Sequence, residues 1–324
     1  MDKTETDMPS TPPQPTRIDY DVVVCSYNGG AYIAEQLESI LKQEPPARQI
    51  LISDDGSTDN TRDIVKQLAE TSPVPVTLID GPRKGVIHNV LTALPQTTAE
   101  YVFLSDQDDI WLENKVALFS EHMRQSDDPH LIFSDAWVWH PGKEEMASFW
   151  KLDDLKPDNA KSPRKLAFHN TVQGASACFN RALINTINTE GAPSEVIMHD
   201  WWLALIASGT GRVSAIKEPT LLYRQHSSNQ VGSQNSAGKK KRNIAKTLFI
   251  ANRILCQAVA FSEHFRERLT PEDRAFFLAY ENAMRGGTLK RLAFILRHRP
   301  THKDLNRTCK LWASILLVKG ARAQ

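Results

Sequence analysis

The feature that most restricts the fold of this chain is an alternation, in its first 125 residues, between short apolar runs and segments with helical spacing. The predicted elements follow in this order: strand 21–25, helix 33–41, strand 49–53, a helix from the cap residues 57–61 to about 69, strand 74–79, helix 86–94, strand 101–105 and helix 112–123. Strands that alternate with helices predict right-handed βαβ units. We therefore expect an α/β fold with a Rossmann-like, mainly parallel sheet flanked by helices, whose ligands bind at the carboxyl ends of the strands.

The rest of the chain has a looser pattern. Further elements are predicted as a strand at 131–134, a long loop or mobile lid at 140–163, a helix at 199–207, strands near 212–216 and 220–224, and helical segments at 243–268, 271–285, 287–298 and 303–318. The predicted organisation is a disordered tail at 1–17, a catalytic domain at 18–232, a basic linker at 233–242 and a basic helical C-terminal region at 243–324.

Charge is distributed unevenly between the two parts of the chain. The segment 239–324 has 19 Lys and Arg against 6 Asp and Glu, a net charge of +13, whereas the remainder has a net charge of −12. Such a division indicates that the two parts meet different partners. An anionic membrane surface suits a basic, partly amphipathic region, with the apolar stretch at 311–318 as the predicted contact. Alternatively, these apolar residues pack on the catalytic domain or on a second subunit in a homodimer.

Cysteine usage and the apolar runs predict a compartment. The four cysteines are far apart and form no CxxC pair, so a reducing cytosol is expected and a zinc site is not. The N-terminus has no apolar core of a secretory signal, and no apolar run reaches 18 residues. We therefore expect a cytoplasmic protein, peripheral on the inner face of the cell membrane. No nucleic-acid motif accompanies the basic region, so nucleic acid is not an expected partner.

Acidic residues gather after two of the predicted strands. Asp54-Asp55-Gly56 follows the strand 49–53, and Asp106-Gln107-Asp108-Asp109 follows the strand 101–105. The first cluster taken alone is better explained as a turn, where Asp and Gly are common. The second brings three carboxylates into four residues, which costs free energy unless a cation neutralises them. Because Mg²⁺ and Mn²⁺ bind through carboxylates and phosphate oxygens, this cluster predicts a metal–diphosphate site.

Five stretches of the chain resemble, in the expected order, the motifs of the family 2 glycosyltransferases, which have the GT-A fold. These stretches are Val24–Gly29, Asp54–Asp59, Ser105–Trp111, His199–Trp202 and Tyr223–His226, and the last two resemble the bacterial polysaccharide branch, which includes rhamnosyltransferases. The resemblance covers about residues 20–232. Cys25 stands where many relatives have Thr, so the resemblance does not imply a side-chain hydrogen bond to the nucleotide base from this position.

The resemblance implies roles for single residues. Asp55 would accept a hydrogen bond from N3–H of a pyrimidine, Asp106 would meet the ribose, and Asp108 would hold a divalent metal ion that bridges to the diphosphate. Tyr27 could stack on the base, although an aromatic side chain packed on the sheet edge explains it equally well. The predicted nucleotide-sugar site comprises Tyr27, Asn28, Asp55, Lys84, Asp106 and Arg224, and the predicted metal site comprises Asp108 and His226, with Mg²⁺ or Mn²⁺ as the ion.

Four further residues are interpreted from their side-chain types, and two of them, His226 and Glu35, have two explanations. The fork of Arg224 matches phosphate geometry, and Lys84 stands at the start of a predicted helix, where anions bind. His226 is a third contact to the metal or diphosphate, or else a surface histidine. Glu35 has a counterpart in relatives, but it lies opposite the apolar stripe of its helix, where a solvated position is expected.

Asp200 is the predicted catalytic base. It stands at the start of a predicted helix, where Asp also serves as an N-cap. Direct displacement at the anomeric carbon of a sugar needs a carboxylate that takes the proton of the acceptor. The segment 170–181 resembles the family segment beneath the acceptor, and its glycine and small residues permit close approach or tight packing.

These observations predict an inverting glycosyltransferase, a hexosyltransferase by class. Its donor would be a UDP- or dTDP-sugar, and its acceptor a saccharide or lipid-linked saccharide in bacterial cell-surface polysaccharide synthesis. Two alternatives remain open, a nucleotide-sugar-binding protein without transferase activity and a metal-dependent nucleotidyltransferase. The second would be expected to have a Gly-rich phosphate loop after the first strand, where this chain has Ser26-Tyr27-Asn28-Gly29-Gly30.

Overall fold

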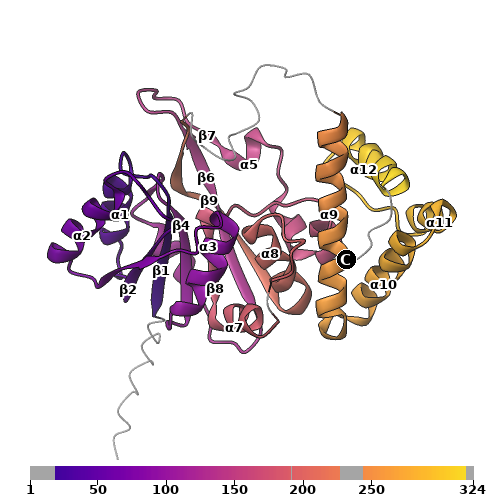
Figure 1. Ribbon diagram of the computed structural model, residues 1–324, viewed down its shortest axis with the longest axis horizontal. Coiled ribbons are helices and arrows are strands. Elements are labelled where there is room, and N and C mark those ends of the chain that lie inside the picture. The colour runs from indigo at the N-terminus through magenta and orange to yellow at the C-terminus, as the bar shows by residue number, and fades with distance from the viewer. Residues whose placement is uncertain (1–18, 191, 227–243, 319–324) are drawn as a thin grey trace, which may run out of the picture.

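The computed structural model describes residues 19–190, 192–226 and 244–318, so the predicted tail at 1–17 and the predicted linker at 233–242 lie outside the described residues. A mixed nine-stranded sheet forms the centre of the molecule (Figure 1). Its strands are β1 (Tyr20–Ser26), β2 (Gln49–Asp54), β3 (Val76–Asp80), β4 (Tyr101–Asp106), β5 (Ile110–Trp111), β6 (His130–Trp139), β7 (Ala147–Ser148), β8 (Ala177–Asn180) and β9 (Arg212–Arg224).

The helices follow the predicted order in the first half of the chain, and further helices follow as far as Leu317. They are α1 (Ile33–Leu41), α2 (Thr61–Thr71), α3 (Val86–Ala93), α4 (Lys115–Ser120), α5 (Phe149–Leu152), α6 (Pro163–Leu166), α7 (Arg181–Glu190), α8 (His199–Thr210), α9 (Ile244–Phe265), α10 (Pro271–Arg285), α11 (Thr288–His298) and α12 (Leu305–Leu317), with 3-10 turns η1 (Leu94–Gln96), η2 (Pro157–Lys161), η3 (Gly174–Ser176) and η5 (Arg266–Arg268). The alternation of strands and helices, and the α/β class that it predicts, are confirmed.

The strand order is β3-β2-β1-β4-β8-β6-β9-β5, with β7 paired to β6. β3, β2, β1 and β4 are parallel, whereas β8 runs antiparallel to both of its neighbours. The strands predicted near 212–216 and 220–224 are one strand, β9, which pairs with β6 through a register shift. The register aligns Ser26 with Asp54 and Cys25 with Asp106. The loops after β1, β2 and β4 therefore leave the same edge of the sheet.

Side chains of the central strands alternate between two apolar cores. Val22 and Val24 face one core, which is completed by Ile33, Leu37 and Ile40 of α1 together with residues of α2 and α4. Val23 faces the other core, which includes α3, α8 and the C-terminal helices. Because successive side chains of a strand point to opposite faces, an unbroken apolar run such as that of β1 is the pattern expected for a strand buried on both sides.

The prediction of a long loop or lid at 140–163 is wrong in part. This segment contains β7, α5 and η2, and Trp150 and Ala160 are buried in the second core. Ser148 caps α5, and its hydroxyl also donates to Asp135 of β6. The segment is therefore held against the sheet by buried apolar side chains. These side chains are too widely spaced in the sequence to form a strand or helix pattern.

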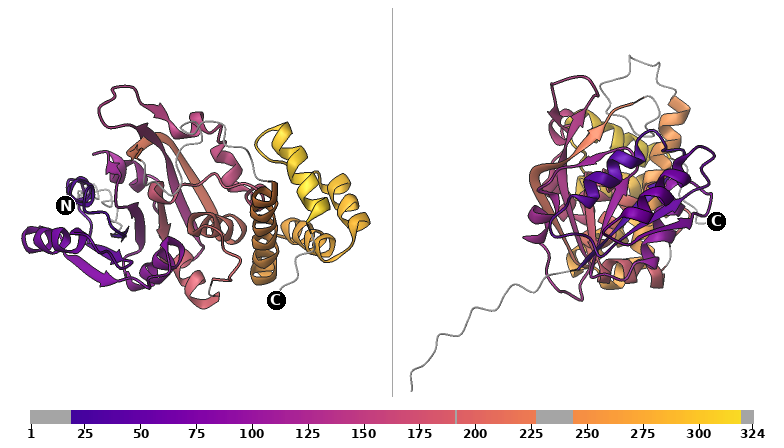
Figure 2. Two further views of the ribbon diagram at one scale, coloured as in Figure 1. Left: turned by 45° about the horizontal axis from the view of Figure 1, so that its top comes forward. Right: turned by 90° about the vertical axis from the view of Figure 1, so that its left-hand side faces the viewer.

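The C-terminal helices share a core with the sheet. Phe261 and Phe265 of α9 pack around Trp202 of α8 with ring centroids 6.3 and 5.9 Å apart, and Phe277 of α10 packs on Phe261 at 5.1 Å. Figure 2 shows α9–α12 gathered at one end of the molecule, opposite α1 and α2. None of the helices in the described part of the chain is long and apolar enough to cross a membrane.

Candidate active site

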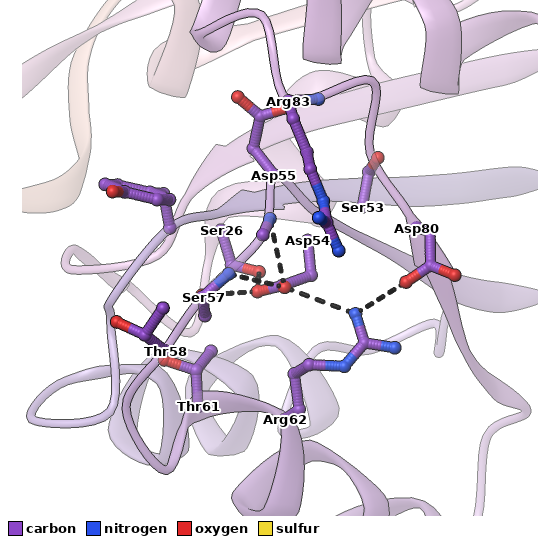
Figure 3. A network of polar contacts seen from close by, with 12 residues as sticks. Ser26, Ser53, Asp54, Asp55, Ser57, Thr58, Thr61, Arg62, Asp80 and Arg83 are labelled. Carbon is purple, nitrogen blue, oxygen red and sulfur yellow. Dashed lines mark hydrogen bonds and ion pairs between the residues drawn. The ribbon is translucent and has the colours of Figure 1, made fainter.

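The turn after β2 is built around Asp54, a buried carboxylate (Figure 3). Asp54 accepts hydrogen bonds from the hydroxyl of Ser26 (3.0 Å) and from the backbone and hydroxyl of Ser57 (2.9 and 2.5 Å), and it pairs with Arg62 (3.2 Å). Burial opposes ionisation, but these hydrogen bonds outweigh it and lower the pKa of Asp54. Asp54 thus holds the turn together and is saturated by protein donors.

Its neighbour Asp55 binds a different loop. Its two carboxylate oxygens accept the backbone N–H groups of Arg83 (2.6 Å) and Gly85 (2.7 Å). Gly85 has a φ of +84°, a conformation that favours glycine, and it directly precedes α3. Asp55 therefore fixes the position of Lys84, whose side chain is exposed beside the carboxyl end of β2. Figure 3 shows Asp55 and Arg83 side by side.

The turn after β1 is tied to the loops on either side of it. Gln107 accepts the backbone N–H of Tyr27 (2.9 Å) and donates to its carbonyl (3.1 Å). Asn28 has a φ of +50°, donates its N–H to Ser57 (2.8 Å) and accepts the N–H of Thr58 with its side chain (2.8 Å). Tyr27 is left 56% exposed, so its side chain is accessible to a ligand. Gln107 is a structural residue that the sequence interpretation missed, although its place between aspartates could have suggested it.

The acidic loop after β4 forms a compact cluster. Asp106, Asp108 and Asp109 offer carboxylate oxygens that all lie within 4.8 Å of one another. Burial, together with the charges of Asp108 and Asp200, raises the pKa of Asp106 to about 7. Burial, together with the charges of Asp106 and Asp108, also raises the pKa of Asp109, whose Oδ2 is buried and has no hydrogen-bond partner among the described residues. Hard oxygen donors, mutual repulsion and an unpartnered buried oxygen all fit a divalent cation.

The end of β9 contacts this loop through Arg224. The guanidinium of Arg224 donates to the carbonyl of Asp108 (2.7 Å) and to the carboxylate of Glu35 (2.5 Å), and its backbone N–H donates to Asp109 (3.2 Å). It also lies 4.5 Å from the ring of Trp139. Arg224 is thus buried and already engaged by protein groups. Glu35 is exposed, as its place on the helix predicts, and it is in addition the ion-pair partner of Arg224.

His226 lies at the edge of the acidic cluster. Its Nε2 is 2.8 Å from Oδ2 of Asp108, and its ring stacks on Tyr32 with centroids 4.7 Å apart. The side chains of His226 and Asp108 are 14% and 16% exposed. The alternative of an isolated surface histidine is therefore wrong.

Asp200 approaches the cluster from α8. The N-cap position is taken by Met198, so Asp200 lies in the first turn and is not the N-cap. Burial raises the pKa of Asp200, although hydrogen bonds from the backbone of Trp201 (2.6 Å) and Gly174 and from the side chain of Asn170 oppose this. Its charge acts on Asp106. The same buried surroundings that favour a neutral carboxyl group are typical of a carboxylate that takes a proton.

The segment around η3 packs closely against Asp200. A Cβ atom on Gly174 would lie 2.8 Å from Nε2 of His199 and 3.6 Å from the side chain of Asp200, so this glycine permits a close approach that a larger residue would prevent. The buried amine of Lys115 lies 3.5 Å from the carbonyl of Ala175 and 3.3 Å from the hydroxyl of Thr220, and burial lowers its pKa to about 7. Lys115 is a supporting residue that the sequence interpretation did not single out, whereas Asn170 belongs to the segment 170–181 that it placed beneath the acceptor.

The predicted site residues thus fall into three groups. Asp106 and Asp108 meet Asp109 and His226 in the acidic cluster, with Asp200 nearby; Asp55 and Lys84 lie together beyond β2; and Tyr27 and Asn28 occupy the turn between these two groups. Arg224 belongs to the first group by its contact with Asp108, but its guanidinium faces Glu35. The arrangement can hold a divalent cation beside a buried carboxylate.

Comparison with known proteins points to one family. Residues 21–179 match glycosyl transferase family 2. The chain is 28% identical to dTDP-rhamnosyl transferase RfbG of Shigella flexneri, over 68% of this chain and 78% of that protein. It is 33% identical to an uncharacterized glycosyltransferase of Nostoc sp., over 67% of each chain. The structure of the mannosyltransferase PcManGT from Pyrobaculum calidifontis, solved with GDP-Man and Mn²⁺, matches 92% of this chain and 79% of that chain with 19% identity and a TM-score of 0.50, and this likeness concerns the fold, GT-A.

Proposed function

The chain belongs to glycosyl transferase family 2 and is a glycosyltransferase, and from this premise we propose that it transfers a hexose, with inversion, from a UDP- or dTDP-sugar to a saccharide or lipid-linked saccharide of a bacterial surface polysaccharide. The observation that carries the proposal is that Asp200 lies close enough to the acidic cluster for its charge to act on Asp106. Donor-binding carboxylates and a separate buried carboxylate are the two parts that a single displacement needs.

The donor would lie across the carboxyl ends of β2, β1 and β4. Tyr27, with an exposed ring, would stack on the base, and Asp55 would accept its N3–H with the lone pairs that the loop 83–85 leaves unused. Asp106 would accept a ribose hydroxyl. Asn28 would shape the turn that approaches the nucleotide, and Lys84 would reach the diphosphate from the start of α3.

The metal-binding residues would be Asp108 and His226, with Asp106 and Asp109 beside them. A bound Mg²⁺ or Mn²⁺ supplies charge stabilisation for the diphosphate as it leaves. Arg224 would hold the acidic loop in place by its hydrogen bond to the carbonyl of Asp108. Its positive charge would also lie close to the departing diphosphate.

Asp200 would remove the proton of the acceptor hydroxyl as the oxygen forms its bond to the anomeric carbon and the bond from that carbon to the diphosphate breaks. The hydrogen bonds from Gly174 and Asn170 orient the carboxylate. Burial excludes water that would otherwise compete with the acceptor for the sugar.

The proposed division of the chain is a catalytic domain at 18–232 followed by the basic linker at 233–242 and the helical region at 243–324. The net charge of +13 after residue 238 supports an anionic membrane surface as a partner and a cytoplasmic, peripheral location on the inner face of the cell membrane. The similarity to RfbG supports a dTDP-sugar among the donors to be tested.

The test is a screen for donor hydrolysis. The purified chain would be incubated with Mn²⁺ and dTDP-rhamnose, UDP-glucose, UDP-N-acetylglucosamine or GDP-mannose, and release of the nucleoside diphosphate would be measured. We expect release from a uridine or thymidine donor that chelator abolishes. Release from none of these donors above the level of an Asp108→Ala control, together with no thermal stabilisation by any of the nucleotides, would overturn the proposal.

A further inference from the structure

Helix α11 exposes an apolar stripe. Leu289, Leu292 and Leu296 are 83%, 41% and 65% exposed, and their spacing puts them on one face of the helix. The opposite face is packed, because Phe294 and Ile295 are buried in the core. Figure 1 places α11 at the outer end of the C-terminal helices, away from the sheet.

The surroundings of the stripe are strongly basic. Between residues 282 and 318 the chain has eight Lys and Arg and a single acidic residue, Asp304. Lys290, Arg297 and Arg299 are exposed on or directly after α11, and within the described chain none of the three forms an ion pair. Leucines flanked by unpaired cations are typical of a helix that lies in the interface of an anionic bilayer.

The stripe is held in a fixed orientation. Arg291, on the packed side of α11, donates to the carbonyls of Ile315 and Met284 (both 3.2 Å) and to that of Val318. These contacts join α11 to α10 and to the end of α12. The stripe is therefore part of a rigid surface, so a bilayer could bind it without any rearrangement.

The stretch 311–318, predicted from the sequence as the membrane contact, is mostly unavailable. Leu311, Ile315 and Val318 are buried, and the indole of Trp312 donates to the carbonyl of Pro300 (2.8 Å). Leu317 alone of its leucines is strongly exposed, at 70%. The prediction of a contact through this stretch as a whole is wrong, because α12 uses its apolar face to pack on its neighbours.

We infer that the α11 stripe, Leu289, Leu292 and Leu296 with Lys290, Arg297 and Arg299, docks on an anionic lipid bilayer. The leucines would enter the headgroup region while the cations meet lipid phosphates. The inference rests on the proposed function in one respect, since a lipid-linked acceptor would lie in the same bilayer. Nucleic acid is disfavoured because leucines and not cations occupy the middle of the surface, and a symmetric dimer because it would bring two cationic rims together.

The loop after α11 connects the stripe to the site. His302 stacks on His169 with ring centroids 4.3 Å apart, and the amine of Lys303 donates to the carbonyl of Asp153. His169 directly precedes Asn170, whose side chain hydrogen-bonds to Asp200. Docking through α11 would thus hold the side of the site that bears Asp200 at a set distance from the bilayer.

The test is vesicle flotation with the full chain. Phosphatidylcholine vesicles with and without phosphatidylglycerol would be compared for the wild type, for Leu289→Glu/Leu296→Glu and for Lys290→Glu/Arg297→Glu. Met146→Glu and Lys66→Glu are matched controls, because Met146 is 45% exposed and the side chain of Lys66 is 63% exposed on the catalytic part. Circular dichroism and donor hydrolysis would verify that each variant is folded.

We expect the wild type and both controls to float with anionic vesicles only, and each double variant to bind them at least tenfold more weakly with donor hydrolysis unchanged. Wild-type flotation by the double variants would overturn the inference. So would equal binding to neutral vesicles, or a homodimer that the leucine variant converts to monomer. Vesicle binding through α11 without hydrolysis of any donor would contradict the proposed function alone, and hydrolysis without vesicle binding would contradict this inference alone.

Discussion

The guanidinium of Arg224 lies 2.5 Å from the carboxylate of Glu35, a contact that joins the end of β9 to α1 across 189 residues of sequence. The same guanidinium donates to the carbonyl of Asp108 at 2.7 Å. The ion pair therefore holds the loop that carries the acidic cluster from outside. Since the side chain of Arg224 is 7% exposed, Glu35 compensates a charge that is largely removed from water.

Glu35→Gln is expected to weaken Mn²⁺ binding several-fold, because the loop of Asp108 loses part of its anchor. The loss of stability should be small, about 1 kcal/mol, since the Glu35 side chain is 54% exposed and water screens the pair. Isothermal titration with Mn²⁺ and thermal unfolding measure the two effects. Glu38→Gln, on the exposed face of the same helix, is the control, and equal behaviour of the two variants would contradict an anchoring role.

Asp108→Ala is expected to abolish transfer and metal-dependent nucleotide binding while the fold persists. The side chain is partly exposed at the sheet edge, so its removal creates no buried cavity. Calorimetry with nucleotide in the presence and absence of Mn²⁺, with circular dichroism for the fold, tests this. Asp63→Ala, at an exposed position of α2, should behave as wild type. Normal activity of Asp108→Ala in the presence of chelator would show that the cluster holds no essential metal ion.

Asp200→Asn is expected to lower turnover by orders of magnitude and to leave donor affinity nearly unchanged. Proton removal contributes only in the transition state, whereas the amide keeps the shape of the carboxylate. Steady-state kinetics and nucleotide titration separate the two quantities. If donor affinity falls strongly and turnover does not, Asp200 is a binding residue.

The pH dependence of turnover should have an acidic limb governed by Asp200. Burial raises the pKa of this carboxyl above its ordinary value of 3.8. A base acts in its ionised form, so the rate should rise with pH through this raised pKa and become constant above it. Turnover measured at saturating donor and acceptor would show the limb. A rate that stays constant down to pH 4 would contradict the assignment.

A buried histidine should make stability depend on pH. Burial, with the nearby charge of Arg212, lowers the pKa of His130 from 6.5 to about 3, and its ring accepts from Arg212 while contacting Ser214. Between these two pKa values the unfolded chain therefore binds one more proton than the folded chain. The contribution of neutral His130 to the free energy of unfolding is fully present above pH 6.5 and is lost as the pH falls toward 3.

Each pH unit in this window should cost about 1.4 kcal/mol from His130. Urea denaturation of the wild type and of His130→Asn at pH 5 and pH 7 measures the difference. The variant should be less stable at both values but should lose less stability on acidification. The same loss in both proteins would assign the effect to other groups, such as His169 and His302, whose pKa values burial also lowers.

Much of the fold and part of the site follow from local sequence patterns. Unbroken apolar runs predict strands buried on both faces, and their alternation with helices restricts the connections to parallel crossovers. Because the carboxyl ends of parallel neighbours share one edge, the sequence also predicts that Asp55 and the loop 106–109 lie at the same edge of the sheet, and the strand register agrees. These features depend on spacings of a few residues, which a sequence displays directly.

What the tertiary structure decided are the contacts between distant segments and the choice among similar faces. Asp54 and Asp55 are adjacent and identical in type, yet one is saturated by Ser26, Ser57 and Arg62 and the other binds the loop before α3. Their difference arises because successive side chains at a strand end point to opposite sides, toward neighbours that belong to other elements.

The same limit applies to the helices near the C-terminus. α11 and α12 both have an apolar face and basic residues, and the sequence favoured the second for contact with a membrane. Packing buries most of that face in α12 and leaves Leu289 and Leu296 exposed in α11. Amphipathic spacing determines that a helix has an apolar face, but only the surrounding helices determine whether that face is covered, because burial requires a partner that the helix's own sequence does not specify.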